Sequence, residues 1–329
     1  MFTTFPDKTL IVYLDQNKWI DLARARTGRA DGQKYQIVLK KIREVVRQDK
    51  AVFPLSWIHF VETRKKRDLK KRKELAEVMA EISQGIAIIP KSIVMNWELH
   101  CAIATAFGET SAPMPSVFGY GMPMIFGRNF LEKEMNSRSD LKSDYLVDRA
   151  KKILSSKESV VNFLVGDDEN LTSKVLQGLR EINEPFVTRL EKSREQDRKD
   201  TDDLQERVYL GVLTLELQPK LIAALGNHGK TMNDFFSLGL ENVRKFFHAV
   251  PTLDVEIELA LSLNKHWDRK LKVNDTSDVA FASISIPYCD VVVTEVFLRT
   301  LATRRKIDKK YETVVISDLN DLLPILDGL

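Results

Sequence analysis

The sequence has little cysteine and almost no excess of charge of either sign. Two cysteines, Cys101 and Cys289, occur in 329 residues. They are too few for a disulfide framework or a cysteine-rich zinc site, so we expect a reducing, cytoplasmic location. The 50 Lys and Arg residues nearly balance the 47 Asp and Glu residues, leaving a net charge of +3. The chain as a whole is therefore not a polycationic coat for nucleic acid, and any basic surface must be local.

Long hydrophobic runs are also missing. A secretory signal peptide needs an apolar region of about 7–15 residues, and a membrane-spanning helix needs about 20 apolar residues. The first apolar run, Leu10 to Leu14, is short and is followed by a carboxylate, as a buried strand would be. We therefore expect a globular protein of one large or two smaller domains, without a membrane partner.

Both ends of the chain alternate short apolar runs with amphipathic stretches, which is the pattern of a parallel sheet covered by helices. Strands are predicted at 10–14, 51–55, 86–89, 291–294 and 313–316. Helices are predicted at 17–25, 35–48, 57–83, 277–286, 296–304 and 319–326, with 57–83 forming either one helix or a pair. The predicted fold class is α/β, with a doubly wound parallel sheet of about five strands.

The middle of the chain, residues 91–272, has a different pattern. Its charged segments have helical periodicity and almost no β-branched alternation. We therefore predict a large helical insertion into a core made of residues 1–90 and 273–329. Within it, the Gly-, Pro- and Met-rich stretch 110–128 predicts a loop, and the polar stretch 191–203 predicts a solvated helix or a mobile connection. The insertion either covers the site or offers a surface to a protein partner or a homodimer.

Acidic residues stand beside several of the predicted strands. Asp15 follows the first strand, Glu62 lies in the helix after the second, and Asp278 opens the helix before the fourth. Asp290 precedes the fourth strand and Glu295 follows it. One such residue alone is more commonly an N-cap or a solvated loop residue. Together they are expected at the rim where ligands bind in open parallel sheets, and all-oxygen ligands favour Mg²⁺ or Mn²⁺ over zinc.

Around these acids the sequence resembles the PIN-domain nucleases. The stretch Ile11-Val-Tyr-Leu-Asp15-Gln-Asn17 is similar to the family's opening hydrophobic-Asp-x-Asn pattern. The stretch from Asp278 to Glu295 is similar to the family's closing pattern, in which an Asp opens a small-residue helix and a strand ends in Thr near an acid. Glu62 matches the acid of the helix after the second strand. About 90 residues at the start and 60 at the end are covered.

Two positions depart from the family's pattern. Glu295 follows Thr294 directly, whereas the closing motif often has one residue between the Thr and the acid. Asp275 precedes Asp278 by three residues, so either of them is a candidate for the third acid. We favour Asp278, because the small-residue helix follows it immediately.

The resemblance implies an endonuclease that hydrolyses phosphodiester bonds, most often in RNA, with Mg²⁺ or Mn²⁺ as cofactor. Its metal ligands would be Asp15, Glu62, Asp278 and Glu295, which hold one or two ions that activate water and neutralise transition-state charge. Asn17 and Thr294 would orient the ligands or the water. Asp290 is either a further catalytic ligand or a brace at the start of its strand.

A basic run directly follows Glu62. Residues 64–73 include eight Lys or Arg residues in ten positions. A run of this kind is commonly a solvated helix face. In this run, however, almost all charges are positive, and the run adjoins the predicted site. A nucleic-acid backbone is its natural partner. The predicted contacts are Arg64, Lys65, Lys66, Arg67, Lys70 and Lys71.

Several alternatives stay open at this level. A haloacid-dehalogenase-like phosphatase also begins with a strand ending in Asp, but it needs a second Asp where this chain has Asn17. A PIN-like module that binds nucleic acid or protein without turnover would keep the same sheet. The segment from Ala224 to Thr231 is a damaged match to a phosphate-binding loop, without a strand before it. His59 is either a site residue or a member of a buried helix.

Overall fold

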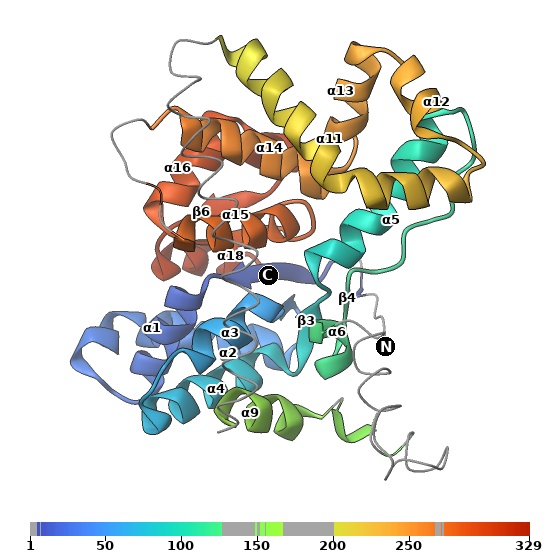
Figure 1. Cartoon of the computed structure of the whole chain (residues 1–329). Coiled ribbons are helices and arrows are strands. Elements are labelled where there is room, and N and C mark those ends of the chain that lie inside the picture. The colour runs from blue at the N-terminus through green and yellow to red at the C-terminus, as the bar shows by residue number, and fades with distance from the viewer. Residues whose placement is uncertain are drawn as a thin grey trace.

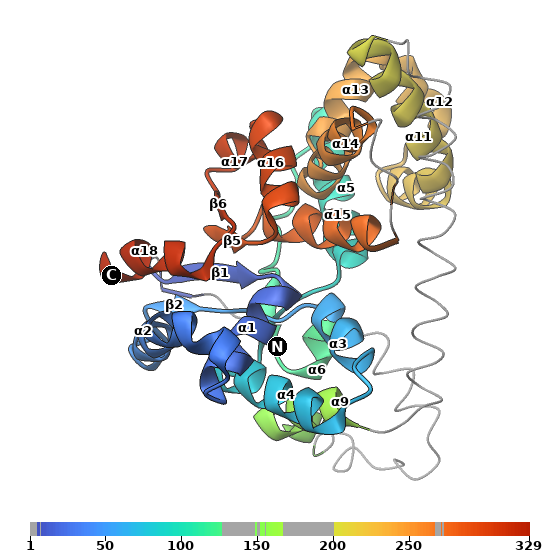
Figure 2. The same ribbon diagram turned by 90° about the vertical axis from the view of Figure 1, so that its left-hand side faces the viewer.

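A small parallel sheet lies among helices that make up most of the structure (Figure 1). The computed structural model describes residues 5–6, 8–126, 149, 152–154, 156–166, 201–266, 271 and 273–329. The predicted class, mixed α/β with a parallel sheet, is confirmed for this part of the chain. Helices α1 to α4 lie on one side of the sheet, and α14, α15 and α16 lie on the other (Figure 2).

The parallel sheet has four strands in the order β2-β1-β5-β6. These are β1 (Leu10–Leu14), β2 (Ala51–Val52), β5 (Val291–Val293) and β6 (Val314–Ile316). Leu14 is in register with Val293, which is in register with Ile316, so three strands end at the same edge. The uninterrupted apolar runs of β1 and β5 fit this central position, because helices cover both faces of the sheet.

The third predicted strand belongs to a second sheet. β3 (Ile86–Ile88) pairs antiparallel with β4 (Phe118–Tyr120). Only a bridge at Leu55, whose N–H donates to the Ile86 carbonyl at 2.9 Å, connects β3 to the chain after β2. The predicted strand 51–55 is therefore broken after Val52, and Pro54, which has no N–H to donate, lies in the interruption. The parallel sheet has four strands instead of five.

The helices largely follow the predicted segments. Their bounds are α1 Gln16–Arg26, α2 Gln36–Arg47, α3 Trp57–Arg64, α4 Leu69–Ser83, α5 Lys91–Ala106, α6 Met122–Phe126, α9 Lys157–Val165, α11 Asp202–Asn227, α12 Met232–Ser237, α13 Leu240–His248, α14 Pro251–Asn264, α15 Val273–Ser285, α16 Val296–Arg304, α17 Ile307–Lys310 and α18 Leu323–Asp327, with 3₁₀ helices η1 Ala30–Tyr35 and η2 Leu319–Leu322. Segment 57–83 is a pair of helices, since the Asp68 side chain caps α4 by accepting from the Lys71 N–H at 3.1 Å.

Three details differ from the predictions. The predicted loop 110–128 contains β4 and α6, which the composition did not indicate because β4 depends on pairing with the distant β3. α15 begins at Val273 instead of 277, so Asp278 lies in its second turn and does not open it. Of the polar stretch 191–203, residues 191–200 lie outside the described residues, and Asp202 already belongs to α11.

Buried apolar side chains form two clusters. The larger one surrounds the sheet, and its fully buried members include Trp19, Phe53 and Phe60. The second cluster lies among α5, α11, α12, α13 and α14, and Phe235 and Phe246 meet there with ring centroids 4.9 Å apart. Because α14 contributes to both clusters, the segment predicted as an insertion shares a core with the sheet.

Helix α11 is long enough and apolar enough to cross a membrane, by length and composition only. Its apolar part is not an uninterrupted apolar run, because it contains Glu216 and Lys220. Its residues Leu210, Leu217 and Leu221 are buried in the second cluster, as those of a core helix are. The expectation that the protein has no membrane partner therefore stays a prediction.

Candidate active site at the carboxyl edge of the sheet

Asp15 lies where the central strand β1 ends and α1 begins. Its backbone N–H donates to the Val293 carbonyl at 2.9 Å, which fixes the residue beside the end of β5. The side chain is only 7% exposed. Burial raises the pKa of Asp15 to about 6 although the Gln16 backbone N–H lowers it, and the nearby Glu295 and Glu62 raise it further. Asp15 is thus a carboxylate at the edge of a core with other acids around it.

Asp278 completes this acidic group from the opposite side of the sheet. It projects from α15, and burial raises its pKa to about 8, with further increases from Asp15, Glu295, Asp275 and Glu62, in that order. Carboxylates influence one another in this way only at short range. The four predicted metal ligands, which follow β1, lie in α3 and α15 and follow β5, are therefore near enough to interact electrostatically, together with the alternative Asp275, but no three of their ligand atoms lie within 4.8 Å of one another. We call these residues the rim acids.

Two side chains at this edge hold particular rim acids. The Asn17 side-chain amide donates to the Glu295 carboxylate at 2.5 Å. Lys65 forms an ion pair with Glu62. The Lys18 ammonium donates to the Ser317 carbonyl at 2.7 Å and lowers the pKa of Asp15. These contacts neutralise part of the negative charge, and the acids nevertheless raise the pKa of Asp278.

Two buried polar atoms next to the rim acids have no hydrogen-bond partner. They are the Gln16 side-chain oxygen and the Thr294 hydroxyl. The Gln16 amide nitrogen is used, since it donates to the Thr63 hydroxyl at 3.0 Å. Buried polar atoms in proteins are nearly always paired. These two are therefore exceptions among the buried polar atoms, and both flank rim acids in the sequence.

His59, which the sequence left open, is a brace beneath the site. Its Nε2 lies 2.8 Å from the Leu14 carbonyl and its Nδ1 lies 2.9 Å from the Ser56 N–H. Burial lowers its pKa to about 4, so the ring is neutral, with Nε2 donating and Nδ1 accepting. The ring also stacks on Tyr13. His59 thereby fixes the last residues of β1, one position before Asp15.

Asp290 lies apart from the other predicted acids. It directly precedes β5, and its carboxylate accepts from the Ile11 N–H at 2.7 Å, near the beginning of β1. Four residues of strand, at about 3.3 Å each, separate that point from Asp15 by roughly 13 Å. Asp290 therefore lies at the amino edge of the sheet. This position fits a brace at the start of β5 and not a catalytic ligand beside Asp15.

The basic run is only partly available on the surface. Arg64 is 7% exposed, donates to the Phe163 carbonyl at 2.8 and 3.0 Å, and stacks on the Phe163 ring. Its planar guanidinium suits this buried contact with α9, so the prediction that it contacts nucleic acid is not supported by its position. Four of the other predicted contacts are exposed, namely Lys65, Arg67, Lys70 and Lys71, and the fifth, Lys66, is half-buried.

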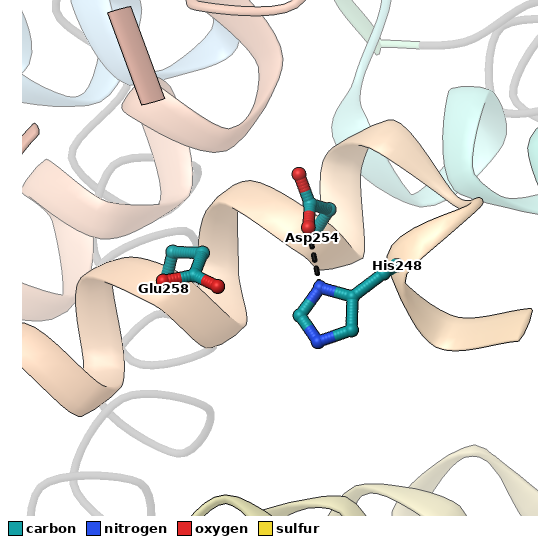
Figure 3. Close-up of side chains that lie close together, drawn as sticks. All are labelled: His248, Asp254 and Glu258. Atoms are coloured by element: carbon teal, nitrogen blue, oxygen red, sulfur yellow. Dashed lines mark hydrogen bonds and ion pairs between the residues drawn. The ribbon is translucent and has the colours of Figure 1, made fainter. Parts of the chain in front are cut away.

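Among the described residues, one trio of side chains brings three metal-ligand atoms within 4.8 Å of one another: His248, Asp254 and Glu258 (Figure 3). The His248 Nδ1 lies 2.5 Å from Asp254, too close for an ion between them. Asp254 also pairs with Lys310 at 2.7 Å, and Glu258 pairs with Arg305. These carboxylates are therefore already neutralised by protein cations. The rim acids, whose charges are less compensated, are more widely spaced.

Comparisons of the chain with protein-family models, with curated proteins and with solved structures found no match.

Proposed function

We propose that this protein is a Mg²⁺- or Mn²⁺-dependent endonuclease of the PIN-like type that hydrolyses RNA. One observation carries the proposal: acids from four separate segments lie near the carboxyl edge of the sheet, where burial first and these acids second raise the pKa of Asp278 to about 8. Such a charge concentration costs stability, and proteins keep it mainly where a cation or a reaction uses it.

The strand order supports a doubly wound arrangement. β1 lies between β2 and β5, and the Leu55 bridge continues the β2 side toward β3. Read as one layer, the order is β3-β2-β1-β5-β6, with connections that run outward in opposite directions from β1. Ligands of open α/β sheets bind at this switch point, outside the carboxyl ends of the strands. Asp15 follows the strand at that point.

The donor set favours a hard divalent cation. Four carboxylates without His or Cys match Mg²⁺ or Mn²⁺ better than zinc. Their mutual repulsion accounts for a spacing wider than that of ligands bound to one ion. A bound ion supplies an activated water and neutralises negative charge at the reacting phosphate.

The remaining residues of the site position these ligands and the substrate. His59 holds the end of β1, and Asn17 holds the Glu295 carboxylate through its amide. Because residue 17 is an asparagine, it does not supply the second carboxyl group that a haloacid-dehalogenase-like phosphatase would need. Lys65, Arg67 and Lys70, which are exposed beyond Glu62, provide positive charge for an RNA backbone.

The experiment is a cleavage assay with purified wild-type protein and the Asp15→Asn variant. Labelled single-stranded RNA, tRNA-like RNA, single-stranded DNA and duplex DNA are incubated with Mg²⁺, Mn²⁺ or EDTA. We expect metal-dependent cleavage of RNA, reduced at least about 100-fold in the variant, since mutations that remove transition-state charge stabilisation cost about that much. The exposed Asp327→Asn serves as the matched control and should retain activity.

Full activity of a folded Asp15→Asn variant, or cleavage in EDTA, would contradict the proposal. Binding of RNA and Mn²⁺ without cleavage of any of the four nucleic acids would favour the module without turnover.

A further inference from the structure

Two histidines that belong neither to the rim acids nor to the His248 trio face each other. His100 lies on α5, and His228 directly follows α11, with the His100 Nδ1 3.2 Å from the His228 Nε2. The rings are tilted by 37°, with centroids 5.4 Å apart. Both residues stand beside the second core cluster, where α5 packs against α11 (Figure 1). The fold thus brings together two imidazoles that are distant in sequence.

The distance between the two nitrogens suits joint coordination of one ion. Zinc–nitrogen bonds are about 2.0–2.1 Å long, and a tetrahedral angle between two of them separates the nitrogens by roughly 3.3 Å. The observed 3.2 Å also allows a hydrogen bond between two neutral rings when no ion is bound. An ion therefore requires a change of tautomer and a small shift of the rings.

Glu109 supplies a second, independent sign of a metal site. Its carboxylate lies 2.7 Å from the His228 Nδ1, the ring nitrogen that points away from His100. An Nδ1–H that donates to this carboxylate leaves the lone pair on Nε2, which is the atom facing His100. A carboxylate that orients a ligating imidazole in this way is the usual environment of histidine metal ligands. Lys230 lies 3.7 Å from the other Glu109 oxygen.

The protonation of His100 fits the same role. Burial and the neighbouring His228 lower the pKa of His100. A neutral ring with a free lone pair is the form that binds metal.

We propose that His100 Nδ1 and His228 Nε2 bind a zinc-class transition-metal ion, with Glu109 orienting His228. Two nitrogen ligands leave positions for water or for a donor atom of a bound molecule. This site differs from the acid-lined edge of the sheet in both place and chemistry, because imidazole selects Zn²⁺, Co²⁺ or Ni²⁺ and carboxylates select Mg²⁺ or Mn²⁺. The proposal is therefore independent of the proposed nuclease activity.

The test is a titration of the full-length, tag-free chain with Co²⁺, followed by visible absorption and by displacement with Zn²⁺. We expect a nitrogen-ligated Co²⁺ spectrum at one ion per chain. His100→Gln and His228→Gln should each weaken binding at least about tenfold, and Glu109→Gln should weaken it about tenfold while keeping the spectrum. His266→Gln should leave this nitrogen-ligated Co²⁺ binding unchanged.

Thermal unfolding gives a second readout. Zn²⁺ should raise the melting temperature of the wild type but not that of the double variant His100→Gln/His228→Gln, because an ion stabilises only the state that binds it. Melting in EDTA establishes that each variant is folded. Unchanged Co²⁺ affinity in folded His100→Gln and His228→Gln would overturn the proposal, as would a zinc-induced rise in melting temperature that persists in the double variant.

Discussion

At the scale of single residues, Asp278 shows most clearly the conflict between stability and the proposed chemistry. Its native pKa of about 8 lies above the ordinary value of 3.8. The native state therefore holds a proton that the unfolded state releases, and the contribution of this group to stability falls as pH rises from about 4 to 8. Burial contributes most to this raised pKa, and repulsion from the other rim acids contributes next. A neutral side chain at this position should therefore remove the loss of stability at high pH.

We predict that Asp278→Asn stabilises the metal-free protein and abolishes cleavage. The gain should be about 1–2 kcal/mol near pH 8 and smaller near pH 5, where the wild-type carboxyl group is protonated. Chemical unfolding in EDTA at both pH values measures it, with Asp327→Asn as the control. A variant that is less stable than the wild type at pH 8 would show that the carboxyl group is structurally required.

The sequence predicted the rim acids because each lies next to the carboxyl end of a strand or in a helix beside that edge. Asp290 was grouped with them because it is also adjacent to a strand, although its place before β5 already puts it at the amino edge. His59 and Arg64 could not be assigned from the sequence. Their roles depend on the Leu14 and Phe163 carbonyls, which are distant in the chain.

At the scale of elements, the contact between α1 and η1 depends on one glycine. A Cβ on Gly32 would lie 2.3 Å from the Ala25 backbone nitrogen. The obstacle is helix backbone, which cannot rotate away as a side chain can. We predict that Gly32→Ala destabilises the protein by about 3 kcal/mol or more, at the upper end of overpacking effects.

Gly211, in the middle of α11, is the matched control, because a Cβ there meets no atom within 4 Å. Gly211→Ala should stabilise the protein by about 0.5–1 kcal/mol, the helix preference of Ala over Gly. Urea unfolding of both variants makes the comparison. Equal stability of Gly32→Ala and the wild type would mean that η1 moves away from α1 freely.

The charged cluster around His248 holds four elements together and should make stability depend on pH. His248 lies between Asp254 of α14 and Glu206 of α11. Glu206 also accepts from Arg244 of α13, and Asp254 accepts from Lys310 of α17. Among the described residues, Asp203, Glu258, Arg305, Tyr311 and Glu241 are further charged or titratable groups near this cluster.

The hydrogen bond to Asp254 raises the pKa of His248 despite its burial. The stabilisation by the charged imidazole is therefore complete below about pH 6.5 and is lost as pH rises through the raised pKa. We predict that His248→Gln lowers the free energy of unfolding by about 1–2 kcal/mol at pH 6 and by less at pH 9. Urea unfolding at both pH values measures this, and a loss that is equal at the two would exclude the protonated ring as its cause.

Most element positions could be predicted because local signals determine them. β5 and β6 are β-branched runs with turns on both sides, and α16 was predicted with its observed bounds. β4 could not be found, because a three-residue strand exists only through its antiparallel partner β3. The start of α15 was placed too late because Asp275 and Thr276, both buried, look like loop residues in the sequence.

At the scale of the whole molecule, a net charge of +3 conceals an uneven distribution of charge. The carboxyl edge of the sheet has the rim acids at its centre and exposed basic residues next to them, beyond Glu62. This pattern would draw an RNA backbone to the periphery and leave the centre to a divalent cation. The opposite, amino edge also has basic residues, Arg47 and Lys50, immediately before β2. They provide a charge-matched comparison.

We predict that Lys70→Gln/Lys71→Gln weakens RNA binding and that Arg47→Gln/Lys50→Gln does not. Each lost contact with a single-stranded phosphate reduces the slope of log K against log salt by about 0.7, so the first pair should reduce it by about 1.4. Binding is measured by fluorescence anisotropy in the Asp15→Asn background, which prevents cleavage. Equal slopes for the two double variants would mean that RNA does not approach along α4, and the basic run would then be only a solvated helix face.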